Sequence, residues 1–476
     1  MKPSNDNTFC WFPFTTLALK QWDTKVGIIM AAPCCNSIRP DNPDPLGISQ
    51  ELRDNPHTVT AHEILNGKRH SACATCWKME DSTKDNPYSY RLDSTPSGLY
   101  RPTDEESLNE LAQHPQLTSI DFAFGENCNL RCRMCTPGLS NKLRLDYRYF
   151  KENNIDTSDI LGFDHKRTEK SIVKDIVSNG FNIDIHDANV LDDYINRKDV
   201  DLVLGAEHQV FWWNDGPQWK NILDNIHTLN HIKATGGETL ISKPFIEFLD
   251  TAIAKGVSNN ILLEFHTNAT KFSNENIKKL KQFDGLNLNL SIDSVGKNYE
   301  YIRYPMKFDK LENSLRNILS SVADHKYKRT PSGFIKTFSF NVVLSALNAH
   351  YLEDLVDFQY GLNSEYTTSV EHANFYVDLL WPEEKFINVK FLPRHIKEDI
   401  IVILNRIVSK YPSGQSLNVQ VDGAINFITA NLDLEITEQH RLNMLREIKV
   451  FDSSRNQCYT DFIHHDIITF LETPII

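Results

Sequence analysis

Six short apolar runs alternate with helical stretches between residues 117 and 380, and this alternation constrains the fold more than any other feature. The strand-like runs are Leu117–Phe124, His231–Thr235, Asn260–His266, Leu286–Ile292, Phe338–Leu344 and Ala373–Leu380. Helix-type apolar spacing with nearby capping residues occurs in Lys243–Lys255, Asn274–Gln282 and Lys310–Ala323. Strands that alternate with helices are typical of parallel sheets. We therefore predict an α/β fold with a six-stranded parallel sheet, open or curled into a partial barrel.

The chain divides into three parts around this alternation. Residues 1–95 carry five of the cysteines and show no strong helical or strand periodicity, whereas residues 115–393 contain the six strand-like runs. Residues 138–230 interrupt the rhythm with a polar stretch rich in Asp and Asn, which we interpret as a helical insertion. Residues 394–476 are predicted to form a helical extension. Its helical stretches are Ile396–Lys410, Asp433–Val450 and Thr460–Leu471.

Composition and charge are those of an ordinary globular protein. The 476 residues are 40% hydrophobic and 24% charged, with a net charge of −13, which excludes a disordered or low-complexity chain. An acidic chain does not attract nucleic acid over its whole surface. The apolar runs are well short of the roughly 20 residues that a membrane helix needs, and the first ten residues do not resemble a secretory signal. We expect a cytoplasmic protein that binds neither membranes nor nucleic acid.

The cysteines are unevenly distributed along the chain. Eight of the nine lie in the first 135 residues, and only Cys458 lies beyond them. A disulfide framework would spread its bridges over the fold, and a large cytoplasmic chain does not need one. Clustered CxxC and CxxxC spacings instead indicate metal–thiolate chemistry. The N-terminal third is therefore predicted to bind metal.

A CxxxCxxC motif formed by Cys128, Cys132 and Cys135 directly follows the first predicted strand. Three thiolates on one tight loop can hold three corners of a [4Fe–4S] cube, which leaves the fourth iron open to a small molecule. A structural zinc site is normally closed by four ligands, so this spacing disfavours zinc. A cluster of buried apolar cysteines without a metal is the remaining interpretation, and the specific spacing disfavours it as well.

On these residues the sequence resembles the radical S-adenosylmethionine (SAM) superfamily, and further segments agree in order. Gly236-Gly237-Glu238 resembles the family's GGE motif, in which the backbone approaches the methionine part of SAM and the Glu accepts its ammonium group. The other positions that the resemblance assigns to cofactor binding are Met134, Thr267, Asn268, Ser291, Asp293 and Arg303. Met134 stands where the family usually has an aromatic residue, and Thr239 stands where a Pro usually follows GGE. The resemblance implies a partial (β/α)6 barrel with its site at the carboxyl ends of the strands.

A second group of cysteines resembles the auxiliary iron–sulfur region called a twitch domain, the short relative of the SPASM domain. Its members are Cys10, Cys34, Cys35, Cys73 and Cys76. Cys10, one of the adjacent pair, Cys73 and Cys76 would supply four ligands. Four thiolates close a second [4Fe–4S] cluster fully, and they satisfy zinc equally well. The neighbouring CxxxCxxC motif favours the cluster.

The resemblance implies that one electron cleaves SAM to methionine and a 5′-deoxyadenosyl radical, which removes hydrogen from a substrate C–H bond. It also implies a flavodoxin- or ferredoxin-type reductant, and a peptide, a protein or a small metabolite as substrate. A nucleotide or nucleobase substrate is the enzymatic alternative, and a zinc-stabilised binding module is the non-catalytic one. The sequence leaves open whether SAM is consumed or regenerated. His464-His465 is interpreted as a cap or core contact rather than as a pair of metal ligands.

Overall fold

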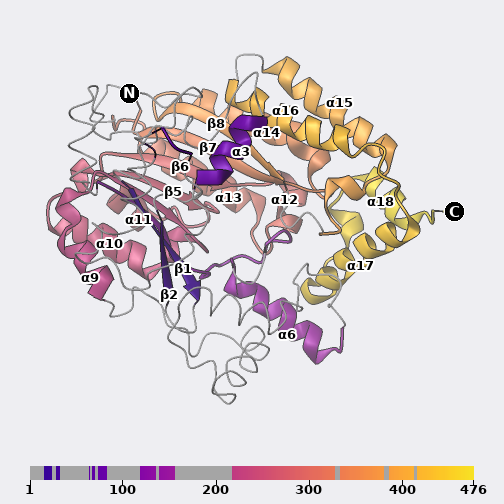
Figure 1. The fold of residues 1–476 in the computed structure, drawn as a ribbon, viewed down its shortest axis with the longest axis horizontal. Coiled ribbons are helices and arrows are strands. Elements are labelled where there is room, and N and C mark those ends of the chain that lie inside the picture. The colour runs from indigo at the N-terminus through magenta and orange to yellow at the C-terminus, as the bar shows by residue number, and fades with distance from the viewer. Residues whose placement is uncertain are drawn as a thin grey trace.

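The structure is a computed structural model, and it describes the greater part of the chain. The described residues are 16–23, 28–32, 64, 67–69, 73–82, 118–135, 139–155, 217–326, 333–379, 385–411 and 415–475. At its centre lies one sheet with the strand order β2-β1-β3-β4-β5-β6-β7-β8 (Figure 1). Within these residues, no helix is both long enough and apolar enough to cross a membrane.

The six predicted strands are all present, and they pair in parallel in the order in which they follow one another along the chain. They are β3 (Ser119–Ala123), β4 (His231–Thr235), β5 (Leu262–Thr267), β6 (Gly285–Ser291), β7 (Ile335–Leu344) and β8 (Val370–Leu379). The mixed α/β class with a parallel sheet is therefore confirmed. Because every strand runs the same way, all the loops that follow the strands emerge at one edge of the sheet.

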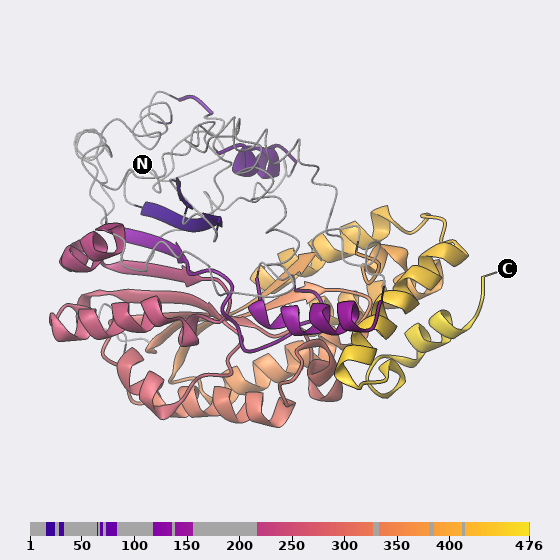
Figure 2. The same ribbon diagram turned by 90° about the horizontal axis from the view of Figure 1, so that it is seen from below.

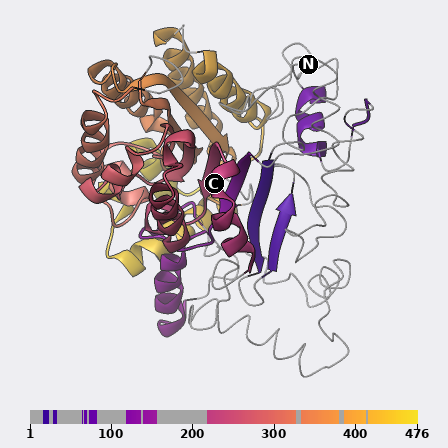
Figure 3. The ribbon, with the colours of Figure 1, turned by 90° about the vertical axis from the view of Figure 1, so that its left-hand side faces the viewer.

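Two further strands lie where the sequence shows no strong strand periodicity. β1 (Thr16–Asp23) pairs in parallel with β3, and β2 (Ile28–Ala32) pairs antiparallel with β1. Figure 3 shows both strands at one edge of the sheet. The N-terminal part of the chain therefore contributes directly to the same hydrogen-bonded sheet as the predicted barrel strands. β2 is a short edge strand, which gives little alternation to detect.

Helices follow the strands and also form the C-terminal extension. Those before residue 390 are α3 (Ala74–Ser82), α6 (Arg144–Glu152), α9 (Pro217–Asp224), α10 (Lys243–Ala254), α11 (Asn274–Leu280), α12 (Gly296–Ile302), α13 (Phe308–Ser321) and α14 (Leu352–Glu365). The extension consists of α15 (Arg394–Lys410), α16 (Gln415–Ala430), α17 (Glu438–Arg455) and α18 (His465–Glu472). Short 3-10 turns are η3 (Asn141–Leu143), η4 (Ile226–Thr228), η5 (Thr239–Ile241), η6 (Ser258–Asn260), η7 (Ala349–Tyr351), η8 (Val389–Phe391) and η9 (Tyr459–Asp461).

The predicted helices are confirmed, with differences at some ends. α17 begins at Glu438 rather than at the predicted Asp433, because the Thr437 hydroxyl and the His440 ring form a capping box at this point. α14 was not predicted, since Gly361 and several polar residues weaken its helical pattern. The described parts of the 138–230 insertion contain α6 and α9, as expected of a helical insertion. The rest of this insertion lies outside the described residues.

The two faces of the sheet differ in chemistry. Alternate residues on β4 to β8 are apolar and fully buried, among them Ala234, Phe265, Leu288 and Phe338 in one register row. The intervening rows are polar. They contain Lys233, Glu264, Asn287 and Thr337 in one row, His266, Asn289, Ser339 and Asn374 in the next, and Ser291, Asn341 and Tyr376 at the carboxyl ends. We call these three rows the polar face. A sheet with one apolar face needs helices on that face only. Some residues of the polar face, among them Asn287 and Ser339, are nevertheless buried.

Aromatic side chains fasten the helices to the apolar face. Phe245 of α10 lies 5.6 Å from Phe265 and 6.3 Å from Phe124, measured between ring centroids. Phe122 lies 5.6 Å from Trp219 of α9 and 6.1 Å from Phe248. Figures 1 and 2 show α9 to α11 gathered at one end of the molecule and α15 to α18 at the other. These contacts hold β3 and β5, which carry parts of the site, against the helices.

Replacing Phe245 with Ala should lower the free energy of unfolding by about 3–5 kcal/mol, because a fully buried ring would leave a cavity between α10 and the sheet. Lys243→Ala, at an exposed position of the same helix, should change it by less than about 0.5 kcal/mol. Urea denaturation followed by circular dichroism measures both. Equal midpoints for the two variants would contradict this account of how α10 is held.

Candidate functional site

The loop after β3 carries all three cysteines of the CxxxCxxC motif. Cys128 and Cys132 are buried, Cys135 is half-buried, and none of the three forms a disulfide. The Cys128 amide donates to Oδ1 of Asn141 at 3.2 Å, and the hydroxyl of Ser140 donates to the Leu130 carbonyl at 2.6 Å. The loop is thus closed on itself by the residues that immediately precede and begin η3.

The same loop is hydrogen-bonded to the segment that follows α12. The Arg131 amide donates to the Tyr304 carbonyl at 2.7 Å, and the Arg133 amide donates to the Ile302 carbonyl at 3.0 Å. These backbone bonds carry the loop across from β3 to the end of β6. The cysteines therefore lie over the carboxyl edge of the sheet, where the resemblance places its active site.

The Gly-Gly turn after β4 packs directly against this loop. Gly236 has φ of +96° and Gly237 has φ of +51°, which are left-handed conformations that favour glycine. A Cβ on Gly237 would lie 2.1 Å from the Asn127 carbonyl oxygen, and a Cβ on Gly236 would lie 2.7 Å from the Gly125 carbonyl oxygen. The Glu238 amide donates to the Asn127 carbonyl at 2.8 Å. Both glycines are therefore required for the two loops to touch.

The carboxylate of Glu238 is fully buried and joins the turn after β4 to the end of β5. It accepts from the Thr267 hydroxyl at 2.6 Å, from the Asn268 amide at 2.7 Å and from the Leu240 amide at 3.1 Å. Burial raises the pKa of Glu238, and these hydrogen bonds oppose the rise. In this structure the carboxylate is held by donors of its own chain, so its predicted contact with a cofactor ammonium group stays a prediction.

The side chain of Asn268 connects β5 to the cysteine loop. Its Nδ2 donates to Asn129 Oδ1 at 3.0 Å and lies 3.8 Å from Cys128 Sγ, within the range of an N–H···S hydrogen bond. Its Oδ1 accepts from the amide and the hydroxyl of Thr270. The amide is thereby fixed in orientation with an N–H group directed at the first sulfur.

Asp293 and Arg303 form a buried ion pair next to the second sulfur. Arg303 Nε donates to Asp293 Oδ2, and its Nη1 lies 3.6 Å from Cys132 Sγ. Asp293 Oδ1 accepts from the Val343 amide at 2.8 Å, which ties the pair to β7. The pKa of Arg303 is raised because Asp293 outweighs the opposing effect of burial. A permanent cation therefore faces Cys132.

The structure also places the remaining predicted residues. Ser291 is half-buried at the end of β6, where it pairs in register with Asn341 of β7. Met134 is 7% exposed and belongs to the main hydrophobic core. Thr267 lies at the end of β5 beside Glu238. Eight of the nine predicted cofactor residues thus lie in the cysteine loop, or at or just after the carboxyl ends of β4, β5 and β6, and Arg303 follows α12.

The thiols of Cys128 and Cys132 are uncharged in the absence of a metal. Burial raises the pKa of Cys128, and it raises the pKa of Cys132 to about 12 even though the cation of Arg303 lowers it. A metal ion deprotonates the thiols that it binds, so iron binding at this loop releases protons. The N–H donors from Asn268 and Arg303 would then face thiolate sulfurs and stabilise them.

The donor set fits an iron–sulfur cube better than zinc. In tetrahedral zinc sites, Zn–S bonds of about 2.3 Å bring the sulfurs within about 3.8 Å of one another. Among the described residues, three ligand atoms that all lie within 4.8 Å of one another occur at His350, His464 and Asp466. The sulfurs of the cysteine loop do not meet this spacing. No fourth cysteine or histidine of the described chain joins them at that distance. A cube is larger than a single ion and takes three thiolates.

Buried cations and a carboxylate of the C-terminal extension hold the loop in place, and the sequence did not point to these contacts. Arg133 is buried, stacks on the Tyr301 ring at 3.5 Å and donates to Asp452 of α17 at 2.5 Å. Lys385 is also buried and donates to the Arg133 carbonyl at 3.1 Å and toward the Cys135 carbonyl at 3.5 Å. The one visible signal was the presence of Arg133 within the motif. Its partners are more than 150 positions away in sequence, so no local pattern connects them to it.

The N-terminal cysteines are only partly described. Cys73 and Cys76 are buried at the start of α3 and are not disulfide-bonded. One helical turn separates them, so both can face the same ligand. Cys10, Cys34 and Cys35 lie outside the described residues. The second cluster therefore stays a prediction, as does the choice between Cys34 and Cys35.

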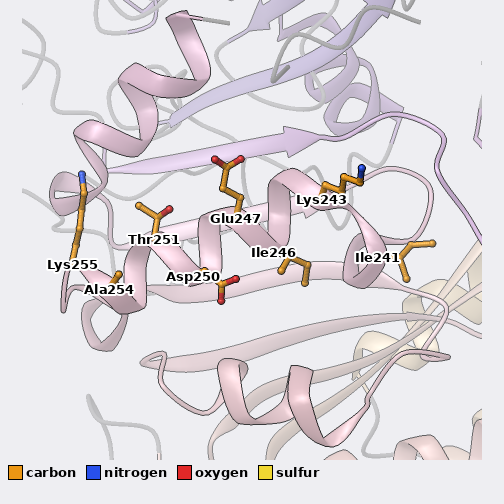
Figure 4. Close-up of a pocket in the computed structure, with 8 residues that line it drawn as sticks. All are labelled: Ile241, Lys243, Ile246, Glu247, Asp250, Thr251, Ala254 and Lys255. Carbon is orange, nitrogen blue, oxygen red and sulfur yellow. The ribbon is translucent and has the colours of Figure 1, made fainter. Parts of the chain in front are cut away.

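A groove of about 710 Å³ lies along the outer side of α10, and Figure 4 shows its lining side chains on this helix and on the turn before it. They include Ile241, Glu247 and Lys255, and none of the predicted cofactor residues. The groove thus belongs to the helical exterior and not to the cysteine loop.

Comparison with known proteins finds no matching family model and no matching curated protein. Among solved structures, the chain is similar to Streptococcus suis SuiB bound to S-adenosylmethionine, with a TM-score of 0.32 and 10% identity over 83% of this chain and 69% of SuiB. It is similar to SuiB bound to its precursor peptide SuiA, with a TM-score of 0.31 and 10% identity over 86% of this chain and 70% of that one. Scores this low carry no conclusion about this chain.

Replacing Gly237 with Ala should prevent assembly of the metal site, because the new Cβ would collide with the Asn127 carbonyl next to Cys128. Iron retained after anaerobic reconstitution should fall by about four per chain. Gly256→Ala is the matched control, since Gly256 also has a positive φ of +70° but has open space around its Cβ position. Equal iron content in the two variants would show that the contact does not shape the site.

Proposed function

We propose that this chain is a radical SAM enzyme in which Cys128, Cys132 and Cys135 hold a [4Fe–4S] cluster with one open iron. The proposal rests on one observation. The cysteine loop lies against the Gly-Gly turn at the carboxyl ends of two adjacent parallel strands, with N–H donors directed at two of its sulfurs. When bound, the cluster supplies one electron to SAM, whose cleavage gives a 5′-deoxyadenosyl radical that abstracts hydrogen from the substrate.

The chain's own residues orient the reactants in this proposal. Gly236 and Gly237 leave the backbone accessible to the amino-acid part of SAM, as the resemblance implies for a GGE motif. Arg303 is held by Asp293 beside Cys132, within reach of a carboxylate bound at the same cluster. Met134 and Ser291 are proposed to contact the adenosine part. Fixed donors of this kind need no reorganisation when charge develops.

The polar face supports a polar substrate. His266, Asn289 and Ser339 share one register row on β5, β6 and β7, and Lys233 lies 3.2 Å from Glu264 one row below. Burial opposes ionisation of Glu264, but Lys233 and His231 outweigh it and lower the pKa below its usual value, so this carboxylate is ionised. A peptide or protein, or a small polar metabolite, fits such a surface, and a nucleotide is the alternative.

Electron supply completes the proposal. The N-terminal cysteines, among them the buried Cys73 and Cys76, are proposed to hold an auxiliary [4Fe–4S] cluster that accepts an electron from the substrate radical. A flavodoxin- or ferredoxin-type protein is proposed as the reductant. Two clusters correspond to about eight irons per chain, and one cluster corresponds to about four.

Replacing Cys128, Cys132 or Cys135 with Ser should abolish 5′-deoxyadenosine formation by anaerobic, dithionite-reduced protein, because each thiolate holds one corner of the cube. Iron content should fall by about four per chain, and the electron paramagnetic resonance signal that shifts on addition of SAM should disappear. Cys458→Ser, which replaces an exposed cysteine outside the loop, should keep both properties. Zinc in place of iron in the unchanged protein, with no 5′-deoxyadenosine formed, would refute the enzymatic proposal.

Replacing Arg303 with Met should make the cluster harder to reduce, because it removes a cation that donates to a ligand sulfur. The midpoint potential, measured by redox titration without SAM, should become more negative than in the unchanged protein. Arg303→Lys keeps the charge and should restore most of the potential. A potential that does not change in Arg303→Met would mean that the guanidinium does not act on the cluster.

A further inference from the structure

Two histidines and one aspartate from distant parts of the chain meet beside the C-terminal helix α18. His350 lies in η7 after β7, whereas His464 immediately precedes α18 and Asp466 lies in its first turn. One ring nitrogen of each histidine and one oxygen of Asp466 all lie within 4.8 Å of one another. Asp466 Oδ2 is 3.3 Å from His464 Nδ1 and 3.8 Å from His350 Nε2.

His350 is buried without any hydrogen-bond partner. Its side chain is 4% exposed, and neither Nδ1 nor Nε2 has a donor or an acceptor within hydrogen-bond distance. Its ring lies parallel to that of His464, with centroids 4.0 Å apart, so the stacking satisfies the ring faces but not the nitrogens. Leaving a buried polar group unpaired is costly in free energy. A positively charged ligand between His350, His464 and Asp466 removes this deficit.

The protonation states favour a metal ion over a proton. Burial and the neighbouring His464 together lower the pKa of His350 to about 4, against the opposing effect of Asp466. Burial also lowers the pKa of His464, against the opposing effects of Asp466 and Asp399. Both imidazoles are therefore neutral near pH 7, and a neutral imidazole has one nitrogen lone pair for coordination. At His464 this lone pair accepts from the Asp466 amide at 3.4 Å, so an ion bound at Nδ1 replaces that hydrogen bond. The exposed His465, whose Nε2 is 3.0 Å from Asp466 Oδ1, is the other titratable group at the carboxylate.

The group is accessible from solvent. Asp466 lines a groove of about 480 Å³ between the start of α15 and α18, together with Arg394, His395 and Phe470. His464 and Asp466 are about one-third exposed, whereas His350 is closed off behind them. A buried imidazole with exposed partners at the wall of a groove gives an ion an entry path and leaves room for a water ligand.

We propose that His350, His464 and Asp466 bind a divalent transition-metal ion, with zinc as the physiological ion. Two imidazoles and one carboxylate are a three-ligand set that zinc accepts with water in the fourth position. Ligand bonds of about 2.0–2.2 Å require the three ligand atoms to draw closer. Because imidazole lone pairs lie in the ring plane, the His350 and His464 rings must also rotate out of their parallel stack. The ion fastens α18 to the loop after β7, which Asn298 already joins to the same region through the Leu347 and Phe462 carbonyls.

The bound ion also bears on the cysteine loop. In the segment that precedes His350, Asn348 donates to the Asp293 carbonyl at 2.9 Å and to the Val343 carbonyl at 3.0 Å. Asp293 in turn holds Arg303 beside Cys132. Fixing His350 therefore restrains the backbone that positions this ion pair. The proposed ion is a structural metal at the edge of the proposed catalytic region, and its site is separate from that of the cluster.

The test uses the full chain with its iron–sulfur sites reconstituted anaerobically, so that cysteines are not free to take zinc. Zinc is added in slight excess, unbound ion is removed by gel filtration, and the retained zinc is measured by mass spectrometry. The unchanged protein should retain about one zinc per chain. Affinity should fall in His350→Ala and Asp466→Asn by more than the roughly 10- to 100-fold that loss of an outer-shell partner causes.

Two further variants keep the result interpretable. His464→Asn removes an imidazole but keeps a good helix N-cap, so it should fold normally and lose the zinc. His227→Ala removes an exposed histidine elsewhere and should retain the ion. Zinc should raise the thermal unfolding midpoint of the unchanged protein and of His227→Ala only. Zinc retained equally by all variants, or by none including the unchanged protein, would overturn the proposal.

Cobalt gives an independent readout of the ligands. Co²⁺ bound to two imidazoles and a carboxylate should show weak visible bands without the intense near-ultraviolet absorption of a sulfur ligand. These bands should be absent from His464→Asn. Cobalt that binds only with sulfur charge-transfer absorption would place the ion on cysteines and would overturn the assignment to His350, His464 and Asp466.

Discussion

The backbone contact between Gly237 and Asn127 is the constraint on which the geometry of the site depends. β3 and β4 are adjacent and in register, so the loops that follow them start side by side. They can lie against each other only because Gly236 and Gly237 have no side chain and adopt positive φ. The Glu238 amide then bonds the Asn127 carbonyl, and the Glu238 carboxylate reaches on to Thr267 and Asn268. Three strand ends are thereby joined around one cysteine loop.

Buried arginines lie in the cysteine loop or beside it, and each forms an ion pair with a carboxylate. Arg303 faces Cys132 and is held by Asp293, whereas Arg133 projects away from the loop to Asp452 of α17. Asp146 of α6 holds both Arg131 and Arg455 at 3.0 Å. Buried charges are tolerated when each has a partner, and removing one partner leaves the other unpaired at a large cost in stability. The C-terminal helices are therefore part of the site's foundation, and Figure 2 shows α6 beside α17 at this end of the molecule.

The two metal proposals differ in how sequence reveals them. The CxxxCxxC motif is local, so its spacing alone restricts the chemistry, and the structure adds the donors from Asn268 and Arg303. His350 and His464 are far apart in sequence, and each by itself is typical of a core or capping histidine. His464 does cap α18 through a 3.4 Å hydrogen bond from the Asp466 amide, in agreement with the interpretation from sequence. Only the fold brings the buried ring of His350 against it.

The sequence by itself determined the α/β class, the six central strands and most of the helices after them, because apolar periodicity records which face of each element is buried. It also determined the cysteine loop and the glycine turn, whose chemistry is carried by adjacent residues. The tertiary structure alone decided that β1 and β2 extend the sheet, that α17 supports the loop through Arg133 and Asp452, and that His350 meets His464. Each of these depends on a contact between distant segments, and the free energy of such a contact comes from burial and pairing that no local pattern encodes.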